Sequence, residues 1–115
     1  MPSKNPVQRL KDIVENIDAI REFTAGMTLE SFTRDRRTVY AVTRALEIVS
    51  EASRRLPDDF KARHSAIDWP AVAASGNIYR HDYDAVDEGL VWQTVEFGLE
   101  SLRRAAQSEL DLPGL

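Results

Sequence analysis

Residues 76–84 bring together the side chains in this sequence that are best suited to chemistry: Asn77, Arg80, His81 and Tyr83. Histidine gives and takes protons near neutral pH, and an adjacent arginine is a permanent cation suited to phosphate. The carboxamide and the phenol add hydrogen-bonding groups. This combination suits proton transfer at a phosphodiester. The alternative is that His81 and Tyr83 only close a helix end, since both residue types are intermediate in burial preference.

A helix beginning at Asp68 to Pro70 is expected to position these residues, with Asp68 as its N-cap. On such a helix Asn77 and His81 lie one turn apart on one face. Gly76 lies inside the same helix and costs up to roughly 1 kcal/mol relative to alanine. We therefore expect Gly76 to have a packing or functional reason.

The charge around this stretch is unfavourable for nucleic acid. From Arg80 to Glu88 there is one cation against four carboxylates, a local sum of -3, and the whole chain carries a formal charge of -4. Proteins that bind nucleic acid usually present a basic surface to the phosphates. Any contact with RNA therefore depends on a few residues or on a partner.

The rest of the chain reads as a helical scaffold. In the segment 35–56 apolar or small residues recur at spacings of 3, 4, 3, 4 and 3, which is typical of a helix packed along its length. No useful alternation of period two appears, so we expect no sheet. The expected helices are 6–23, 35–56, 68–83 and 87–110, with a turn or one short helical segment at 28–32 and a short helix at 57–63. The sequence predicts an all-α, up-and-down bundle of four to five helices in a single domain, 1–115, with the last helix packed on the segment 35–56.

Two acidic residues, Glu47 and Glu51, lie one turn apart on the segment 35–56. They are either an exposed acidic face paired with neighbouring arginines, or Glu51 lies beside the site and orients His81. The second histidine, His64, is expected in an exposed loop without a role.

Composition limits the remaining possibilities. The chain has 115 residues, 43% hydrophobic and 30% charged, which is ordinary for one compact domain. It has no cysteine and two well-separated histidines, so we expect no disulfide, no metal and no cofactor. No long apolar run or targeting segment is present, and we expect a cytoplasmic protein with no membrane contact.

The order of these features resembles the HepT-like family of the HEPN superfamily, over roughly residues 10–110. The resemblance is carried by Arg-Ala-Leu-Glu-Ile-Val-Ser-Glu-Ala at 44–52, Ile-Asp-Trp at 67–69, Asn77 four residues before His-Asp-Tyr at 81–83, Val-Asp at 86–87 and Val-Trp at 91–92. It implies an all-helical homodimer with facing motifs. It also implies a toxin encoded beside a minimal nucleotidyltransferase (MNT-type) antitoxin.

The family motif is Arg, four to six residues, His, one residue, Tyr, and it is associated with metal-independent RNA cleavage. Carried over, the resemblance makes His81 the general acid/base and Asn77 the polar residue after the motif arginine. Tyr83 would contact RNA or accept AMP from the antitoxin. The motif arginine is missing, because Gly76 stands where it is expected. Since residues 76 and 80 share a side of a helix, we infer that Arg80 occupies the space of that arginine.

Two functions remain open on this resemblance. The first is a metal-independent endoribonuclease toxin, neutralised by AMPylation of Tyr83. RNA cleavage without a metal needs a base and an acid, and one His81 per chain supplies one such group, so a dimer with an isologous interface is expected. The alternative is a non-catalytic nucleotide-binding or interaction module that keeps the nucleotidyltransferase partner.

Overall fold

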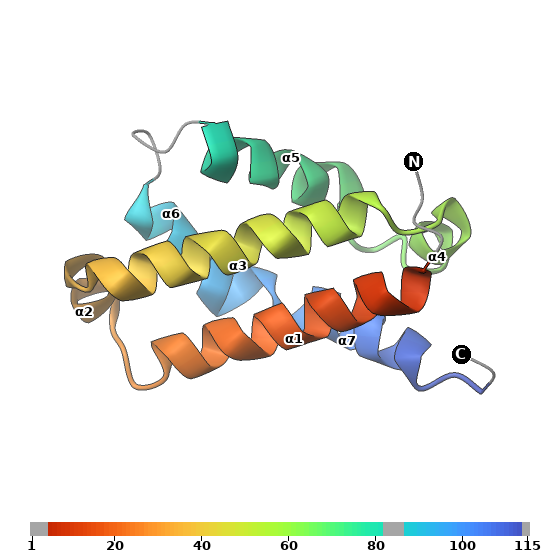
Figure 1. Ribbon diagram of the computed structural model, residues 1–115, viewed down its shortest axis with the longest axis horizontal. Helices are drawn as coiled ribbons and strands as arrows, with labels where there is room; N and C mark the ends of the chain where they lie inside the picture. The colour runs from red at the N-terminus through yellow and green to blue at the C-terminus, as the bar shows by residue number, and fades with distance from the viewer. Residues whose placement is uncertain (1–4, 82–86, 114–115) are drawn as a thin grey trace.

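The computed structural model describes residues 5–81 and 87–113, and for residues 77–81 it describes the backbone alone. Every regular element in those ranges is helical, and the helices run alternately up and down the long axis (Figure 1). They are α1 (Pro6–Thr24), α2 (Leu29–Arg34), α3 (Arg36–Arg54), α4 (Asp58–Arg63), α5 (Trp69–His81), α6 (Glu88–Gln93) and α7 (Glu100–Leu110), with a π-helical turn at Thr94–Gly98. The predicted all-α bundle is confirmed.

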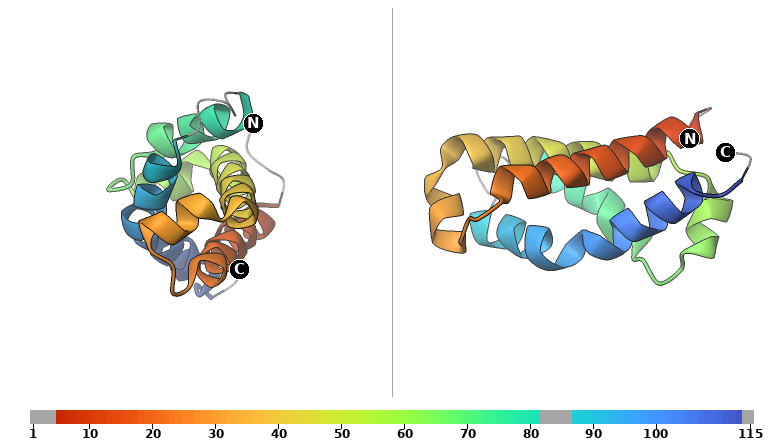
Figure 2. Two further views of the ribbon diagram at one scale, coloured as in Figure 1. Left: turned by 90° about the vertical axis from the view of Figure 1, so that its left-hand side faces the viewer. Right: turned by 90° about the horizontal axis from the view of Figure 1, so that it is seen from below.

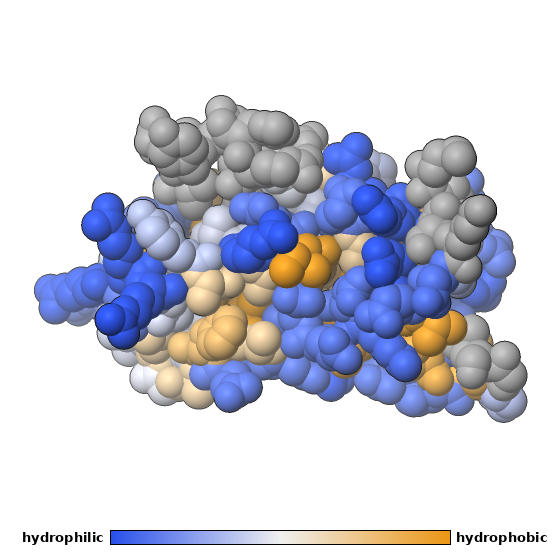
Figure 3. Space-filling view, viewed as in Figure 1, coloured by the Kyte–Doolittle hydropathy of each residue, from blue (hydrophilic) through white to orange (hydrophobic). Residues whose placement is uncertain are grey.

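The core forms where α1 and α3 lie antiparallel against each other, with α5 on a second side of α3 and α7 along α1 (Figures 1 and 2). Ile13, Ile17 and Ile20 of α1 and Val42 of α3 are fully buried, as their three- and four-residue spacing predicts. The face formed by α1 and α3 is mostly hydrophilic, with small apolar areas between the charges (Figure 3). No helix in the described ranges is long and apolar enough to cross a membrane.

Side-chain caps set several helix starts close to where the sequence predicts them. Asp35 accepts a hydrogen bond from Thr38 N at 3.2 Å, so it caps α3 from outside rather than beginning it. Asp68 accepts from Ala71 N at 3.1 Å at the start of α5, and Asp87 caps α6. The segment 28–32 also folds as a helix, α2, which begins with a capping box at Thr28.

The final helix differs from the prediction. Instead of one helix over 87–110 packed on α3, the chain forms α6, the π-helical turn and α7. α6 lies beside α2, where the ring of Trp92 packs at 5.1 Å from that of Phe32, and α7 lies along α1. Arg103 Nε donates to Asp18 Oδ1 at 2.6 Å across the α1–α7 contact. The apolar spacing predicts a helix but not which neighbour its face meets.

Candidate active site

The candidate site is the C-terminal end of α5, which includes Asn77, Arg80 and His81. The backbone of these residues is helical, as predicted, and their side chains lie outside the described part of the structure. Tyr83 lies outside the described residues altogether. The site is therefore built from the elements that hold α5.

Trp69 fixes the start of α5. Its indole Nε1 donates to the backbone carbonyls of Lys61 and His64, at 3.2 and 3.1 Å. Its ring lies 5.5 Å from the ring of Phe60, and the residue is only 8% exposed. A buried tryptophan whose N–H is satisfied orients the element that carries it.

Ser50 of α3 holds the middle of α5. Gly76 N donates to Ser50 Oγ at 3.0 Å, and this hydroxyl lies within hydrogen-bonding distance of Val72 O at 2.9 Å and Ala73 O at 3.0 Å. Val72 O and Gly76 N are the two ends of one helical hydrogen bond, so the Ser50 hydroxyl is inserted beside that bond. Both Ser50 and Gly76 are buried.

This contact explains the glycine at position 76. A Cβ atom there would lie 2.4 Å from Ser50 Oγ and 2.9 Å from Ser50 Cβ, too close for any side chain without a shift of α5 or α3. The expectation that Gly76 has a packing reason is confirmed. Position 76 faces Ser50, so an arginine there would have no room, and the inference that Arg80 takes the place of the motif arginine stays a prediction.

Sequence reasoning missed Ser50. The available signal was a serine on the largely apolar inner side of the segment 35–56, where a hydroxyl needs a partner when buried. Paired with a glycine in the next long helix, such a serine indicates close helix approach. The pair could have been proposed from residue types, but its register could not.

The acidic residues of α3 pair with arginines three or four residues away in the sequence. Arg44 Nη1 is 3.0 Å from Glu47 Oε2, and Arg55 Nε is 3.1 Å from Glu51 Oε1. Glu47 keeps 17% of its side chain exposed and Glu51 41%, so each pair is partly screened by water. This supports the pairing interpretation, and the orienting role of Glu51 stays a prediction.

The register of α3 and α5 shows which residues of α3 lie beside the C-terminal end of α5, called the motif end below. The two helices are antiparallel, and Gly76 lies beside Ser50. Counting residues in opposite directions from that contact, position 81 lies level with about position 45 of α3. The N-terminal half of α3 therefore runs alongside and beyond the end of α5. Thr43 lies in this half, and its buried Oγ1 has no hydrogen-bond partner among the described residues.

The second histidine is not an exposed loop residue. His64 Nε2 lies 3.1 Å from Glu109 Oε1, and Arg63 holds the same carboxylate through Nε at 2.8 Å and Nη2 at 3.1 Å. Hydrogen bonding from Arg63, with a further contribution from His64, lowers the pKa of buried Glu109. The cluster ties the loop before α5 to the last turns of α7.

None of the described side chains form a group of three or more His, Asp or Glu residues able to hold a metal ion. The Ser50 hydroxyl and the Asp68 carboxylate hydrogen-bond to the backbone of α5. What the described geometry fixes is the position and direction of the helix that ends at His81.

Comparisons with known proteins show which family this sequence matches. The family model described as "Ribonuclease HepT-like" matches residues 13–109. A "Probable ribonuclease HepT" of Thermococcus cleftensis is 43% identical over 94 residues, covering 82% of this chain and 86% of that protein. A "Putative RNase" of Methanocaldococcus jannaschii is 35% identical over 95 residues, covering 83% and 78% of the two chains. A "Putative RNase" of Caldanaerobacter subterraneus is 30% identical over 92 residues, covering 80% and 82%.

A comparison with solved structures found no match. The family match runs from the middle of α1 to the end of α7 and includes all of α5. The chain belongs to the HepT-like family.

Proposed function

We propose that this chain is a metal-independent endoribonuclease of the HepT type. The observation that carries the proposal is the family match over residues 13–109, which spans α5 and the segment with His81 and Tyr83. Relatives named as ribonucleases match over most of their length. The packing of α5 supports the same function, because Trp69 and Ser50 fix the helix that carries His81.

In the proposed reaction a 2′-hydroxyl attacks the adjacent phosphorus, forming the O2′–P bond and breaking the P–O5′ bond. One His81 takes the proton of the 2′-hydroxyl, and a second acid protonates the leaving 5′-oxygen. The products are a 2′,3′-cyclic phosphate and a 5′-hydroxyl. Because each chain has one His81, a homodimer would supply both proton-transfer groups. Asn77 and Arg80 would stabilise the negative charge on the phosphorane.

We propose that Tyr83 is the control point. A partner nucleotidyltransferase would transfer AMP from ATP to the phenol, forming a phosphodiester and releasing pyrophosphate. The added negative charge and purine, two residues from His81, would oppose an approaching RNA phosphate. The segment already carries a local sum of -3, which strengthens the effect.

The contact between Gly76 and Ser50 favours a second candidate, a non-catalytic nucleotide-binding or interaction module. Position 76 is occupied by a helix contact, so it supplies no cation to the site. If Arg80 does not replace that cation, the fold and partner would persist without cleavage.

One experiment separates the two. The purified chain is incubated with RNA in EDTA, and cyclic-phosphate ends are measured by mass spectrometry beside the His81→Ala variant. Cleavage that is lost in His81→Ala, with unchanged helical circular dichroism, supports the ribonuclease. Absence of cleavage by the wild-type chain, or undiminished cleavage by the folded variant, would contradict it.

A further inference from the structure

A cation and an aromatic ring lie exposed together near the start of α3. The Arg36 guanidinium carbon is 5.7 Å from the centre of the Tyr40 ring, one helical turn away. Tyr40 is 63% exposed, unusual for a large aromatic residue. In the described part of the chain Arg36 has no carboxylate partner, whereas its neighbour Arg34 pairs with Glu30 at 2.8 Å.

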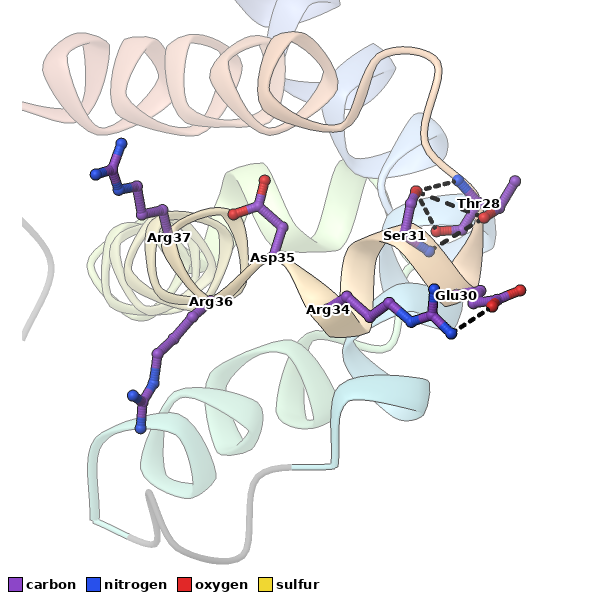
Figure 4. Close-up of a pocket in the computed structure, with 7 residues that line it drawn as sticks. All are labelled: Thr28, Glu30, Ser31, Arg34, Asp35, Arg36 and Arg37. Atoms are coloured by element: carbon purple, nitrogen blue, oxygen red, sulfur yellow. Dashed lines mark hydrogen bonds and ion pairs between the residues drawn. The ribbon is translucent and has the colours of Figure 1, made fainter.

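Figure 4 shows how the basic residues around this point diverge. Arg36 and Arg37 are adjacent and both exposed, but their side chains leave α3 in different directions. Asp35, between them and Arg34, uses its carboxylate to cap α3 at Thr38. Two of the three arginines therefore remain without an ion pair among the described residues.

The side of α3 that carries Arg36 is the side that meets α5. At about 100° per residue, Arg36 and Tyr40 lie roughly 40° and 80° around the helix from Ser50, whereas Arg37 lies roughly 140° away. Ser50 contacts the backbone of α5 through its hydroxyl, so it marks that side. Along the axis, Tyr40 and Arg36 lie roughly 7 and 13 Å beyond the level of position 81. A short RNA segment can span this distance between the motif end and the pair of Tyr40 and Arg36.

We propose that Arg36 and Tyr40 form an accessory binding surface for single-stranded RNA, which leads the strand to the end of α5. Arg36 contacts a backbone phosphate, and a base stacks on the exposed part of the Tyr40 ring. This rests on the proposed function, because RNA is the ligand of the same site. Proteins bind single-stranded nucleic acid with exposed aromatic rings that stack on bases and with cations that contact the backbone, and Tyr40 and Arg36, which has no ion pair among the described residues, offer both groups.

The surface also resolves a difficulty of charge. The chain is acidic overall and carries a local sum of -3 around the motif, so the motif end alone repels a polyanion. Arg36 on α3 is a cation that does not belong to residues 80–88, the acidic segment of the sequence. Arg36 and Tyr40 together provide the few residues on which an RNA contact in this chain must depend.

The test measures binding separately from cleavage. The full chain carrying His81→Ala is titrated against a fluorescent single-stranded RNA, and anisotropy is followed between about 50 and 200 mM salt. In this background Arg36→Gln weakens binding about five-fold and lowers the slope of log affinity against log salt by about 0.7, the loss of one phosphate contact. Tyr40→Leu weakens binding about ten-fold, and Tyr40→Phe, which keeps the ring, restores it.

Arg37→Gln is the matched control, because it removes the same charge from the neighbouring residue on a different side of α3. An equal loss for Arg36→Gln and Arg37→Gln would reduce the effect to net charge and overturn the proposal. Unchanged RNA binding, with weakened binding of the nucleotidyltransferase, would identify a protein interface instead and also overturn it. Binding that depends on Arg36, together with no RNA cleavage by the wild-type chain with His81 intact, would refute the proposed ribonuclease while leaving this surface intact. RNA cleavage that is unchanged by Arg36→Gln and Tyr40→Leu in the chain with His81 intact, together with unchanged RNA binding, would refute this surface while leaving the ribonuclease intact.

Discussion

Substituting Gly76 with alanine tests whether the contact with Ser50 holds α5 in place. The new Cβ would meet Ser50 Oγ at 2.4 Å, about 1 Å inside ordinary contact, and would crowd Ser50 Cβ at 2.9 Å. Forcing an extra methyl group into a packed contact costs about 1–3 kcal/mol, and weakening the hydrogen bond from Gly76 N adds about 1 kcal/mol. Alanine regains about 1 kcal/mol of helix propensity.

The expected net loss in free energy of unfolding is therefore about 1–3 kcal/mol. The loss in free energy is measured by urea denaturation, followed by helical circular dichroism. In thermal denaturation the same loss corresponds to a fall in Tm of roughly 4–12 °C. Gly98→Ala is the matched control. A Cβ at Gly98 finds Thr94 Cγ2 at 3.5 Å, an ordinary contact, so this change is expected to be neutral or to stabilise the protein by up to about 1 kcal/mol.

A double-mutant cycle with Ser50→Gly assigns the cost to the contact itself. Ser50→Gly removes both atoms that the new methyl group would meet, so Gly76→Ala should cost at least about 1 kcal/mol less in that background. If Gly76→Ala is as stable as Gly98→Ala, the proposal that the contact with Ser50 holds α5 in place is refuted. It is also refuted if Gly76→Ala lowers the free energy of unfolding equally with serine and with glycine at position 50.

Further expectations can be checked with standard methods. Gly76→Arg in an Arg80→Ala background should lose helical stability rather than regain RNA cleavage, because the larger side chain meets the same atoms of Ser50; restored cleavage by a stably folded double variant would contradict this. Glu109→Gln should destabilise the chain by about 1 kcal/mol at pH 7 in urea titrations. A carboxylate whose pKa is lowered in the folded state stabilises it above its unfolded pKa, so this difference should disappear as the pH falls below about 4; a constant difference would exclude the charge of Glu109 as the cause. Sedimentation should give about 26 kDa, twice the 13.0 kDa chain, and a monomer that cleaves RNA would defeat the dimer proposal. Co-expression with the nucleotidyltransferase should add adenylate mass that is absent in Tyr83→Phe, and persistence of the increments would exclude Tyr83.

Much of the fold could be predicted because its signals are local. The spacing of Ile13, Ile17 and Val42 reports which faces are buried, and the carboxylates of Asp68 and Asp87 mark helix starts through hydrogen bonds to nearby amides. These interactions lie within a few residues along the chain. The structure keeps these starts, and the bounds of α1 to α4 differ from the expected ones by one or two residues, whereas the helix expected over 87–110 is interrupted at Thr94–Gly98 and the expected end at 83 lies outside the described residues.

The features that could not be predicted depend on contacts between residues far apart in the sequence. Ser50 meets Gly76 across 26 positions, and Glu109 meets His64 across 45. Neither contact leaves a periodic trace in the sequence, so the sequence indicates neither the pairing of His64 with Glu109 nor the contact of Ser50 with Gly76. For the candidate site, the sequence identified the helix that carries His81, and the structure added what holds that helix.

The π-helical turn at Thr94–Gly98 has a consequence for insertions and deletions during evolution. A wider turn accommodates one residue more than an α-helical turn, and each residue corresponds to about 100° of rotation. The turn thus lets α6 face α2 while α7 faces α1. Deleting a single residue there would restore a straight helix and turn one of these faces away from its partner. Relatives of this chain should therefore tolerate substitutions in the turn more readily than a change in its length.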